Sequence, residues 1–432
     1  MFKRIFTLGF CAVLGYLVAL GLLEVVSARG LLPNREAQNA AARVREIMLL
    51  VNKHSVDADK VKGDELAARA IAGVLEPLDR YTEYLDATSY HQLEEDIGNQ
   101  FGGIGVQVEQ VEKRVAVVAP IAGSPGERAG ILRGDVIAKV DGESVADLKL
   151  TELVRRLRGE PGSTLNVTML RSEGRAVGAA ATEREVEFAL KREVIRVDSV
   201  RDIELGTDGV AYLRLTQFGD RTGEEFNQAL IGLEKKGMRA LVLDLRNNPG
   251  GLITAAEEVA DPFFERDDRV FYTQGGETED RREYRAKGRR PRVAVPMAVL
   301  INGGSASAAE IVTGALKDTK RAVIVGERSF GKGSVQTIFP LRENAALRLT
   351  TARYYTPSGA VIHEKGIEPD VVVILTKEEE KAVFLSRLRP DLKDAAEFKA
   401  KFGVELAADL QLEAAYRVVR EKLSGVKQET TK

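Results

Sequence analysis

The chain has 432 residues and a nearly balanced charge, with 63 Lys and Arg against 65 Asp and Glu. This length exceeds one compact core and predicts two or three domains, while the balanced charge argues against a nucleic-acid partner. One cysteine, Cys11, and three histidines, His54, His91 and His363, exclude a disulfide framework and cysteine metal ligands. We therefore expect no metal and no other cofactor.

The first 28 residues have the pattern of an export segment. Lys3 and Arg4 give a basic start, and an uncharged, mostly apolar run follows over 5–23. Small residues at 26–28 suit signal peptidase, whereas the run is also long enough to span a bilayer. Both interpretations predict export to the periplasm, with either a cleaved signal peptide or an anchor in the inner membrane.

Residues 29–96 are predicted to form an N-terminal helical region, with helices over 36–52 and 64–78. The first helix carries a narrow apolar stripe at spacings of four and three, made of Ala37, Ala41, Val44, Met48 and Val51. Such a stripe is typical of the seam of a helix pair.

The composition changes over 97–190. Short Val-rich runs there alternate between apolar and polar residues, and Gly and Pro separate the runs. This pattern predicts a small β-rich domain with one helix over 148–157. The segment 172–185 is expected to be a soft loop.

Predicted strands and helices alternate over residues 191–375, which predicts an α/β layered core. Strands are expected over 210–215, 240–245, 298–301 and 322–325, and helices over 224–236, 252–259 and 308–317. The charged stretch 275–292 is expected to be an exposed interruption. Residues 376–432 are predicted to be helical.

The last helix has an apolar face made of Leu412, Ala415, Val419 and Leu423. This face and the N-terminal stripe both lack an evident partner helix in the sequence. Two unpaired apolar faces at opposite ends of the chain predict two self-association surfaces, and hence a homo-oligomer larger than a dimer. The alternative is that both faces pack on their own core.

A serine in the run NGGSASAAEI (302–311) is the first candidate for chemistry. Ser307 follows a predicted buried strand and opens a helix, where free amides and the helix dipole favour a developing oxyanion. The competing interpretation is purely structural, because Ser307-x-x-Glu310 also fits a capping box.

Two further runs have the composition of a site. In SFGKGSVQ (329–336), glycines flank Lys332, and the phosphate-loop spacing is absent; a solvated turn lysine is the alternative. In DLRNNPGG (244–251), a glycine pair follows a predicted strand and could bring amides close to a ligand, or form only a tight turn.

In their order along the chain, DLRNNPGG, NGGSASAAEI and SFGKGSVQ resemble the signature of the carboxyl-terminal processing proteases, which are S41 family serine peptidases. The resemblance covers about residues 70–375 and includes LDRYTEYL (78–85), FGGIGVQV (101–108), AGILRGDVI (129–137), TTARYYTPSG (350–359) and GIEPD (366–370). Any one run is weak, but the ordered set is specific. Ala309 stands where a serine is more usual, and 172–185 is longer than typical.

The resemblance implies an α/β fold with a ClpP/crotonase-like protease core and an inserted β-rich PDZ domain between helical N- and C-terminal regions. The corresponding segments are an export segment (1–28), an N-terminal helical region (29–96), a PDZ domain (97–190), a protease core (191–375) and a C-terminal helical region (376–432).

The resemblance also assigns residues and partners. It implies Ser307 as nucleophile, Lys332 as general base and Gln336 as its neutral orienting group. The oxyanion hole would use the amides of Ala308 and of one glycine of the pair Gly250 and Gly251. The loop Gly103, Ile104, Gly105 and Val106 would hold the C-terminal carboxylate of a peptide. Some relatives depend on an adaptor lipoprotein for substrate delivery.

A free lysine has a pKa of about 10.4, so a lysine base must be buried or placed near a helix N-terminus to lose its proton near neutral pH. Arg158 could relay the position of the PDZ domain to the active site, as in gated relatives. Two other functions stay open: a PDZ scaffold without protease activity, and acyl-CoA chemistry on a crotonase-like core.

Overall fold

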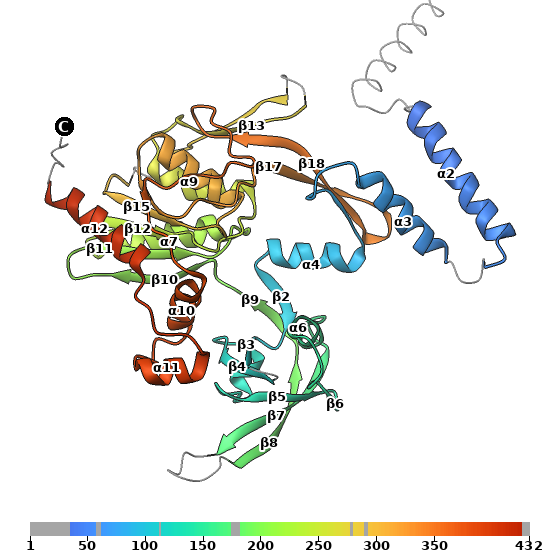
Figure 1. The fold of residues 1–432 in the computed structure, drawn as a ribbon, viewed down its shortest axis with the longest axis horizontal. Coiled ribbons are helices and arrows are strands. Elements are labelled where there is room, and N and C mark those ends of the chain that lie inside the picture. The colour runs from blue at the N-terminus through green and yellow to red at the C-terminus, as the bar shows by residue number, and fades with distance from the viewer. Residues whose placement is uncertain are drawn as a thin grey trace, which may run out of the picture. The chain divides into compact units, whose positions relative to one another are not determined.

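The computed structural model describes residues 35–57, 62–111, 114–173, 182–276, 280–288 and 293–425 (Figure 1). The predicted export segment therefore lies outside the described residues. None of the described helices is long and apolar enough to cross a membrane. The chain forms two compact units, Met1–Tyr84 and Leu85–Lys432.

The N-terminal unit contains the two helices expected from the sequence. They are α2 (Arg35–His54) and α3 (Gly63–Leu75). Helix α2 buries none of its side chains, and Val44 in the predicted stripe is 42% exposed. The stripe therefore exists as an exposed feature of α2.

The β-rich domain contains an antiparallel sheet in the order β3-β4-β5-β7-β8, with β6 beside β5. Its strands are β3 (Val106–Val111), β4 (Arg114–Pro120), β5 (Val136–Val140), β6 (Glu143–Ser144), β7 (Thr164–Glu173) and β8 (Thr182–Lys191). Helices α5 (Pro125–Arg128) and α6 (Leu150–Leu157) complete it. The prediction of a soft loop over 172–185 was too wide, because Thr182–Glu185 pairs with β7.

A two-stranded ribbon joins this domain to the core. Strand β2 (Gln100–Gly103) runs antiparallel to β9 (Glu193–Arg196). Before the ribbon come β1 (Glu83–Leu85) and helix α4 (Ala87–Ile97), and after it the chain enters the core at β10 (Val200–Leu205). Asp86 caps α4 by accepting a hydrogen bond from the Ser89 N–H at 2.8 Å.

The core contains a six-stranded sheet in the order β10-β11-β12-β15-β16-β19. Strands β11 (Val210–Leu215), β12 (Ala240–Asp244), β15 (Met297–Ile301), β16 (Val323–Gly326) and β19 (Val371–Val372) are parallel, and β10 is antiparallel to β11. Every residue of β12 and β15 is buried, as expected of a parallel sheet covered on both faces.

Helices cover the two faces of this sheet. Leu241 and Leu243 belong to one cluster with side chains of α7 (Thr222–Lys235), α8 (Ile253–Ala260) and α9 (Ala308–Asp318). Val242 points to the opposite face and packs with Ala415 and Val419 of α12 (Leu410–Ser424), as the layers in Figure 1 show. The α/β layered core predicted from the alternation is confirmed.

The core also contains a second, mostly antiparallel sheet. Its β17 (Ser334–Pro340) and β18 (Ala346–Tyr355) form a long hairpin, and β18 also pairs with β13 (Arg269–Gln274), which pairs with β14 (Arg282–Arg285). Strand β14 falls in the charged stretch expected to be an interruption. Short 3-10 turns occur at Asp261–Phe263 and Arg342–Asn344.

The C-terminal region is helical, as predicted, with α10 (Lys377–Leu388) and α11 (Ala395–Phe402) before α12. Ala415 and Val419 of α12 are fully buried against the sheet. The expectation of a second self-association surface there was wrong, because the chain's own core covers this face.

A buried network of charges ties this region to the sheet. Arg246, which follows β12, donates to both oxygens of Asp244, the last residue of that strand. It also donates to both oxygens of Asp409, which directly precedes α12. Gln411 accepts a further bond from Arg246 at 3.0 Å, and Arg387 of α10 also contacts Asp244 and Asp409. Arg246 is 4% exposed, so the network is largely closed to water.

Candidate active site

The candidate site lies where four consecutive parallel strands end. Because the carboxyl ends of parallel strands meet at one edge of a sheet, the loops that follow β11, β12, β15 and β16 lie side by side. These loops contain, in order, Phe218, the glycine pair at 250–251, Ser307 and Lys332. The topology therefore brings together runs that are far apart in the sequence.

Ser307 directly precedes α9 and has an unusual backbone conformation. Its φ is 54° and its ψ −117°, outside the conformations that a non-glycine residue ordinarily adopts. Its backbone N–H donates to Glu310 Oε2 at 2.9 Å. The capping-box arrangement is thus present, but the strained backbone is more than a cap requires and is typical of functional sites.

Lys332 lies in a loop that the same glutamate holds. Glu310 accepts hydrogen bonds from the backbone N–H groups of Gly331 at 2.7 Å and Lys332 at 2.8 Å, and from the Ser329 hydroxyl at 2.5 Å. Burial raises the pKa of Glu310, although these hydrogen bonds and the one from Ser307 act in the opposite direction.

One cavity of about 680 Å³ collects the predicted catalytic residues. Ser307, Lys332, Gln336 and the glycine pair line it, together with apolar side chains that include Phe218, Leu252, Ile253, Val335 and Ile338. The Gln336 amide donates to Ser334 Oγ at 2.8 Å and Thr350 Oγ1 at 3.2 Å. An apolar cavity with few convergent polar groups is the usual form of a substrate site.

The glycine pair lies directly against the nucleophile loop. A Cβ on Gly250 would lie 2.7 Å from Ser307 Cβ and 2.8 Å from the Ala308 amide nitrogen, so only glycine fits here. The Gly250 N–H already donates to Asn248 Oδ1 at 2.9 Å. Gly251 lies against the Phe218 backbone, where a Cβ would be 2.1 Å from the carbonyl oxygen, so the pair offers two differently placed amides near the nucleophile loop.

A second, smaller cavity of about 150 Å³ lies in the β-rich domain. Gly103, Ile104, Gly105 and Val106 line it, opposite the α6 side chains Val154 and Leu157. Strand β3 is at the edge of its sheet, so its outer side is open to an added strand. Gly105 has a φ of 69°, and a Cβ there would lie 2.2 Å from Ser124 Cβ.

Arg158 connects the two cavities. It lines the smaller one and lies over the Phe101 ring at 4.4 Å. Its guanidinium is also 3.9 Å from Glu95 on α4, whose neighbour Asp96 lines the larger cavity. Burial raises the pKa of Asp96, and the charge of Arg158 opposes that shift.

Comparisons with known proteins identify the family. Residues 209–373 match the model of peptidase family S41, and residues 102–190 match that of the PDZ domain. The chain is 41% identical over 313 residues to the carboxy-terminal-processing protease of Bartonella bacilliformis, which is 72% of this chain and 70% of that protein. This chain belongs to the carboxy-terminal processing proteases. It is a serine peptidase with a PDZ domain that acts on protein substrates.

Other members of the family agree with this placement. The protease is 35% identical over 316 residues to the carboxy-terminal processing protease CtpA of Bacillus subtilis, covering 72% of this chain and 65% of that one. A solved putative S41 protease from Bacteroides fragilis NCTC 9343 has a similar fold, with a TM-score of 0.51 at 16% identity over 81% of this chain and 87% of that chain.

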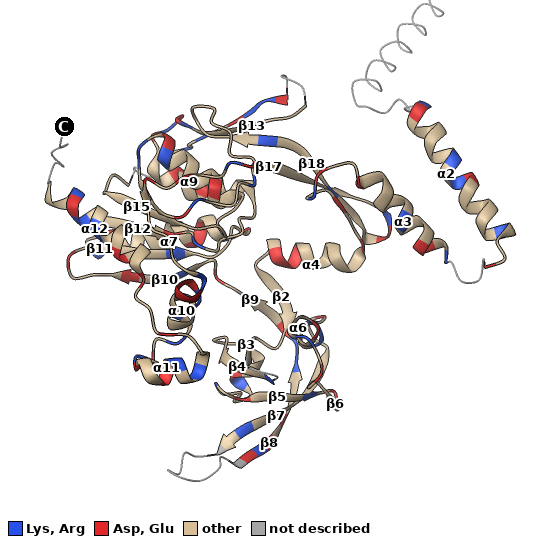
Figure 2. Ribbon diagram, viewed as in Figure 1, with Lys and Arg blue, Asp and Glu red and all other residues tan. Residues whose placement is uncertain are grey.

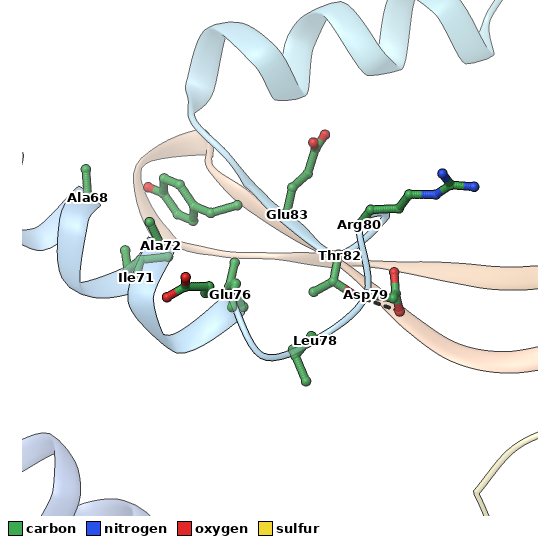
Figure 3. A pocket seen from close by; sticks show the side chains of 11 residues that line it. Ala68, Ile71, Ala72, Glu76, Leu78, Asp79, Arg80, Thr82 and Glu83 are labelled. Carbon is green, nitrogen blue, oxygen red and sulfur yellow. Dashed lines mark hydrogen bonds between the residues drawn. The ribbon is translucent and has the colours of Figure 1, made fainter.

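A third hollow of the protease lies in the N-terminal unit, between the last turn of α3 and the turn after it (Figure 3). Ile71, Ala72 and Leu75 give it an apolar side, and Asp79 accepts a hydrogen bond from the Tyr81 N–H at 2.8 Å. Its polar lining comes from residues 76–84, and none of the residues predicted to be catalytic lines it.

The sequence interpretation missed two residues that contact the site. Glu310 was considered only as a cap, and Tyr354 only as part of the run TTARYYTPSG. The Tyr354 hydroxyl donates to the Lys332 carbonyl oxygen and lies 3.2 Å from the Ser307 carbonyl oxygen. Charged residues of both signs are interspersed along helices such as α9, α11 and α12 (Figure 2).

Proposed function

We propose that this protease cleaves exported proteins at or near their C-termini, with Ser307 as nucleophile, Lys332 as general base and Gln336 as the group that orients the lysine. One observation carries the proposal: all three residues and the glycine pair line a single cavity at the carboxyl edge of the sheet.

The chemistry follows from these positions. Ser307 Oγ attacks the scissile carbonyl carbon while its proton passes to Lys332 Nζ, giving a tetrahedral intermediate whose oxyanion faces the amides of Ala308 and Gly251. The protonated lysine then gives its proton to the leaving amine as the C–N bond breaks. Water attacks the acyl-enzyme, loses a proton to the lysine, and releases the acid and the serine hydroxyl.

Gln336 suits the orienting role because it is neutral. Its amide nitrogen donates to Ser334 and Thr350, and its carbonyl oxygen would accept from the lysine amine in this proposal. A carboxylate at this position would instead stabilise the ammonium form and raise the pKa of the base.

The PDZ groove would select the substrate. An extended C-terminal segment would add to the open edge of β3, with its carboxylate at the amides of Gly103, Ile104, Gly105 and Val106. Arg158 would report occupancy of the groove to α4, which lines the catalytic cavity. Periplasmic location, an adaptor lipoprotein and self-association through the exposed stripe of α2 belong to the same proposal.

The test compares four full-length proteins on fluorescein-labelled β-casein, an unfolded substrate. Ser307→Ala and Lys332→Ala should each lower turnover by about 1,000-fold or more while the circular dichroism spectrum stays unchanged, because each removes a reacting group. His363→Ala should retain most of the activity. An active Lys332→Ala with an inactive His363→Ala would refute the lysine base.

The non-proteolytic alternative rests on the PDZ groove alone. A scaffold would bind casein equally well with and without the serine hydroxyl and would release no fragments from wild-type protein. Acyl-CoA chemistry would require turnover of an acyl-CoA ester that Ser307→Ala lacks.

A further inference from the structure

Two buried side chains join the backbones of Ser307 and Lys332 to each other. Oxygen Oε2 of Glu310 accepts the Ser307 N–H at 2.9 Å and the Lys332 N–H at 2.8 Å. On the carbonyl side, the Tyr354 hydroxyl donates to the Lys332 oxygen and lies 3.2 Å from the Ser307 oxygen. Both residues are thus held at their N–H and at their C=O groups by the same two partners.

These contacts link parts of the chain that are otherwise independent. Ser307 follows β15 and Lys332 follows β16, whereas Glu310 is in the first turn of α9 and Tyr354 is near the end of β18. The position of the lysine relative to the serine therefore depends on more than the sheet register. It depends on one carboxylate and one phenol that lie between the two loops.

A cap alone does not account for the environment of Glu310. The side chain is fully buried, and a buried carboxylate is costly unless its oxygens are bonded. A capping box requires only the bond from Ser307. The other three bonds come from Ser329, Gly331 and Lys332, and the Ser329 hydroxyl in turn accepts the Ile367 N–H at 2.7 Å.

Packing alone does not account for Tyr354 either. Its ring is 1% exposed and belongs to the main core cluster, a role that phenylalanine would fill equally well. The hydroxyl adds contacts with the carbonyl oxygens of the two catalytic loops, at Lys332 and Ser307. The neighbouring Tyr355 differs, because its ring stacks on Tyr272 at 4.9 Å.

We infer that Glu310 and Tyr354 are positioning residues that fix the separation of Ser307 and Lys332 and so set the efficiency of proton transfer between them. The inference rests on the proposed serine–lysine pair. In this role each acts through the backbone of a reacting residue, although Tyr354 also lines the catalytic cavity. They also hold Ser307 in its strained conformation, which would otherwise relax.

Tyr354→Phe tests the inference with the smallest change, and Tyr355→Phe is its matched control. In full-length protein, Tyr354→Phe should lower kcat on fluorescein-labelled β-casein about tenfold or more, with KM and the melting temperature unchanged, because a misplaced base slows the chemical step. The acid limb of its pH–kcat profile should move to higher pH as the lysine leaves its site. Tyr355→Phe should match wild type throughout.

Glu310→Gln provides a second, independent arm. Its amide nitrogen must face one of the two pairs of donors that the carboxylate now accepts, so either the bonds from Ser307 and Lys332 or those from Ser329 and Gly331 are lost. We expect a similar fall in kcat. The double variant should lose less than the product of the two single losses, since both changes disturb the same separation.

The outcomes are separable. If Tyr354→Phe and Glu310→Gln both keep kcat within about twofold of wild type while Ser307→Ala is inactive, the positioning role is refuted and the proposed function stands. A fall in melting temperature with unchanged kcat would also refute it, because the residues would then only stabilise the fold. An active Ser307→Ala would refute the proposed function and this inference together.

Discussion

The protease core and the PDZ domain each bury an arginine–aspartate pair, but they surround it differently. In the core, all five N–H donors of Arg246 are used, on Asp244, Asp409 and Gln411, and Asp244 is fully buried. In the PDZ domain, Arg171 bonds both oxygens of Asp135 at 2.8 and 2.6 Å while its own side chain stays 22% exposed.

The difference predicts how strongly each pair resists local opening. In the core, the loss of one partner leaves a buried charge without its counter-charge, so the sheet and the C-terminal helices are expected to open together. A pair that is partly in contact with water loses less free energy when it is broken. The pair within the PDZ domain is therefore expected to stabilise its domain less than the core pair does.

The largest expected effect comes from breaking the core pair. Arg246→Ala removes the buried guanidinium and leaves only the partly exposed Arg387 beside Asp244 and Asp409. It should lower the free energy of unfolding by about 3–5 kcal/mol, read from urea denaturation. Arg171→Ala should cost clearly less, because the partly exposed Arg171 covers the buried Asp135 and its removal opens that carboxylate to water. The Leu132 N–H still donates to Asp135 at 2.8 Å. Equal losses would remove the distinction between the two domains.

The next effect separates the glycine loops of the two domains. Gly250→Ala places a Cβ 2.6 Å from the Ala306 carbonyl oxygen beside the nucleophile and should lower kcat about 100-fold. Gly105→Ala places its Cβ against Ser124 in the peptide groove and should instead raise KM for casein about tenfold.

Steady-state kinetics on both variants gives the answer, with Gly232→Ala as the control, since no heavy atom lies within 4 Å of a Cβ there. A kcat loss of the same size in Gly105→Ala would mean that the groove takes part in catalysis as well as binding.

The smallest effect is a pH dependence of stability with opposite signs at two capping boxes. Burial raises the pKa of Glu310, so its stabilising contribution is present below the ordinary value of 4.5 and is lost as pH rises through the raised pKa. The melting temperature of wild type minus that of Glu310→Gln should therefore fall across this range and then level off.

Exposed Glu379, which caps α10 with Thr376, gives the opposite case. Hydrogen bonds from the Thr376 backbone and side chain lower its pKa, so its contribution is present at neutral pH and is lost as pH falls. The difference between wild type and Glu379→Gln should rise with pH. Melting curves with the same sign for both variants would contradict the role of burial.

Much of the fold could be predicted from the sequence, because the spacing of apolar residues and the Gly and Pro residues between elements are local signals. The alternation after residue 194 predicted the parallel strands and their helices, and glycine-rich runs at strand ends predicted the loops that line the cavity. The sequence could not show where amphipathic faces pack. The stripe of α2 and the face of α12 look alike as patterns, yet α12 lies on the sheet and α2 is exposed.

The missed site residues have the same physical cause. The spacing of Ser307 and Glu310 matches a cap, and that bond is local. The other partners of Glu310 come 19 to 22 residues later, in a loop brought near only by the pairing of β15 with β16. Tyr354 is similar, because only the tertiary fold brings its hydroxyl to two carbonyl groups.

The position of α12 in the chain has a consequence for biosynthesis. A ribosome makes Ser307 first, then Lys332 and Tyr354, and only later residues 410–424. Until those residues are in place, one face of the sheet beneath the nucleophile loop lacks Ala414, Ala415 and Val419, and Arg246 lacks Asp409. The sheet that supports the nucleophile loop is therefore covered on both faces only after residues 410–424 have been made, so completion of the core is expected to wait for this last helix.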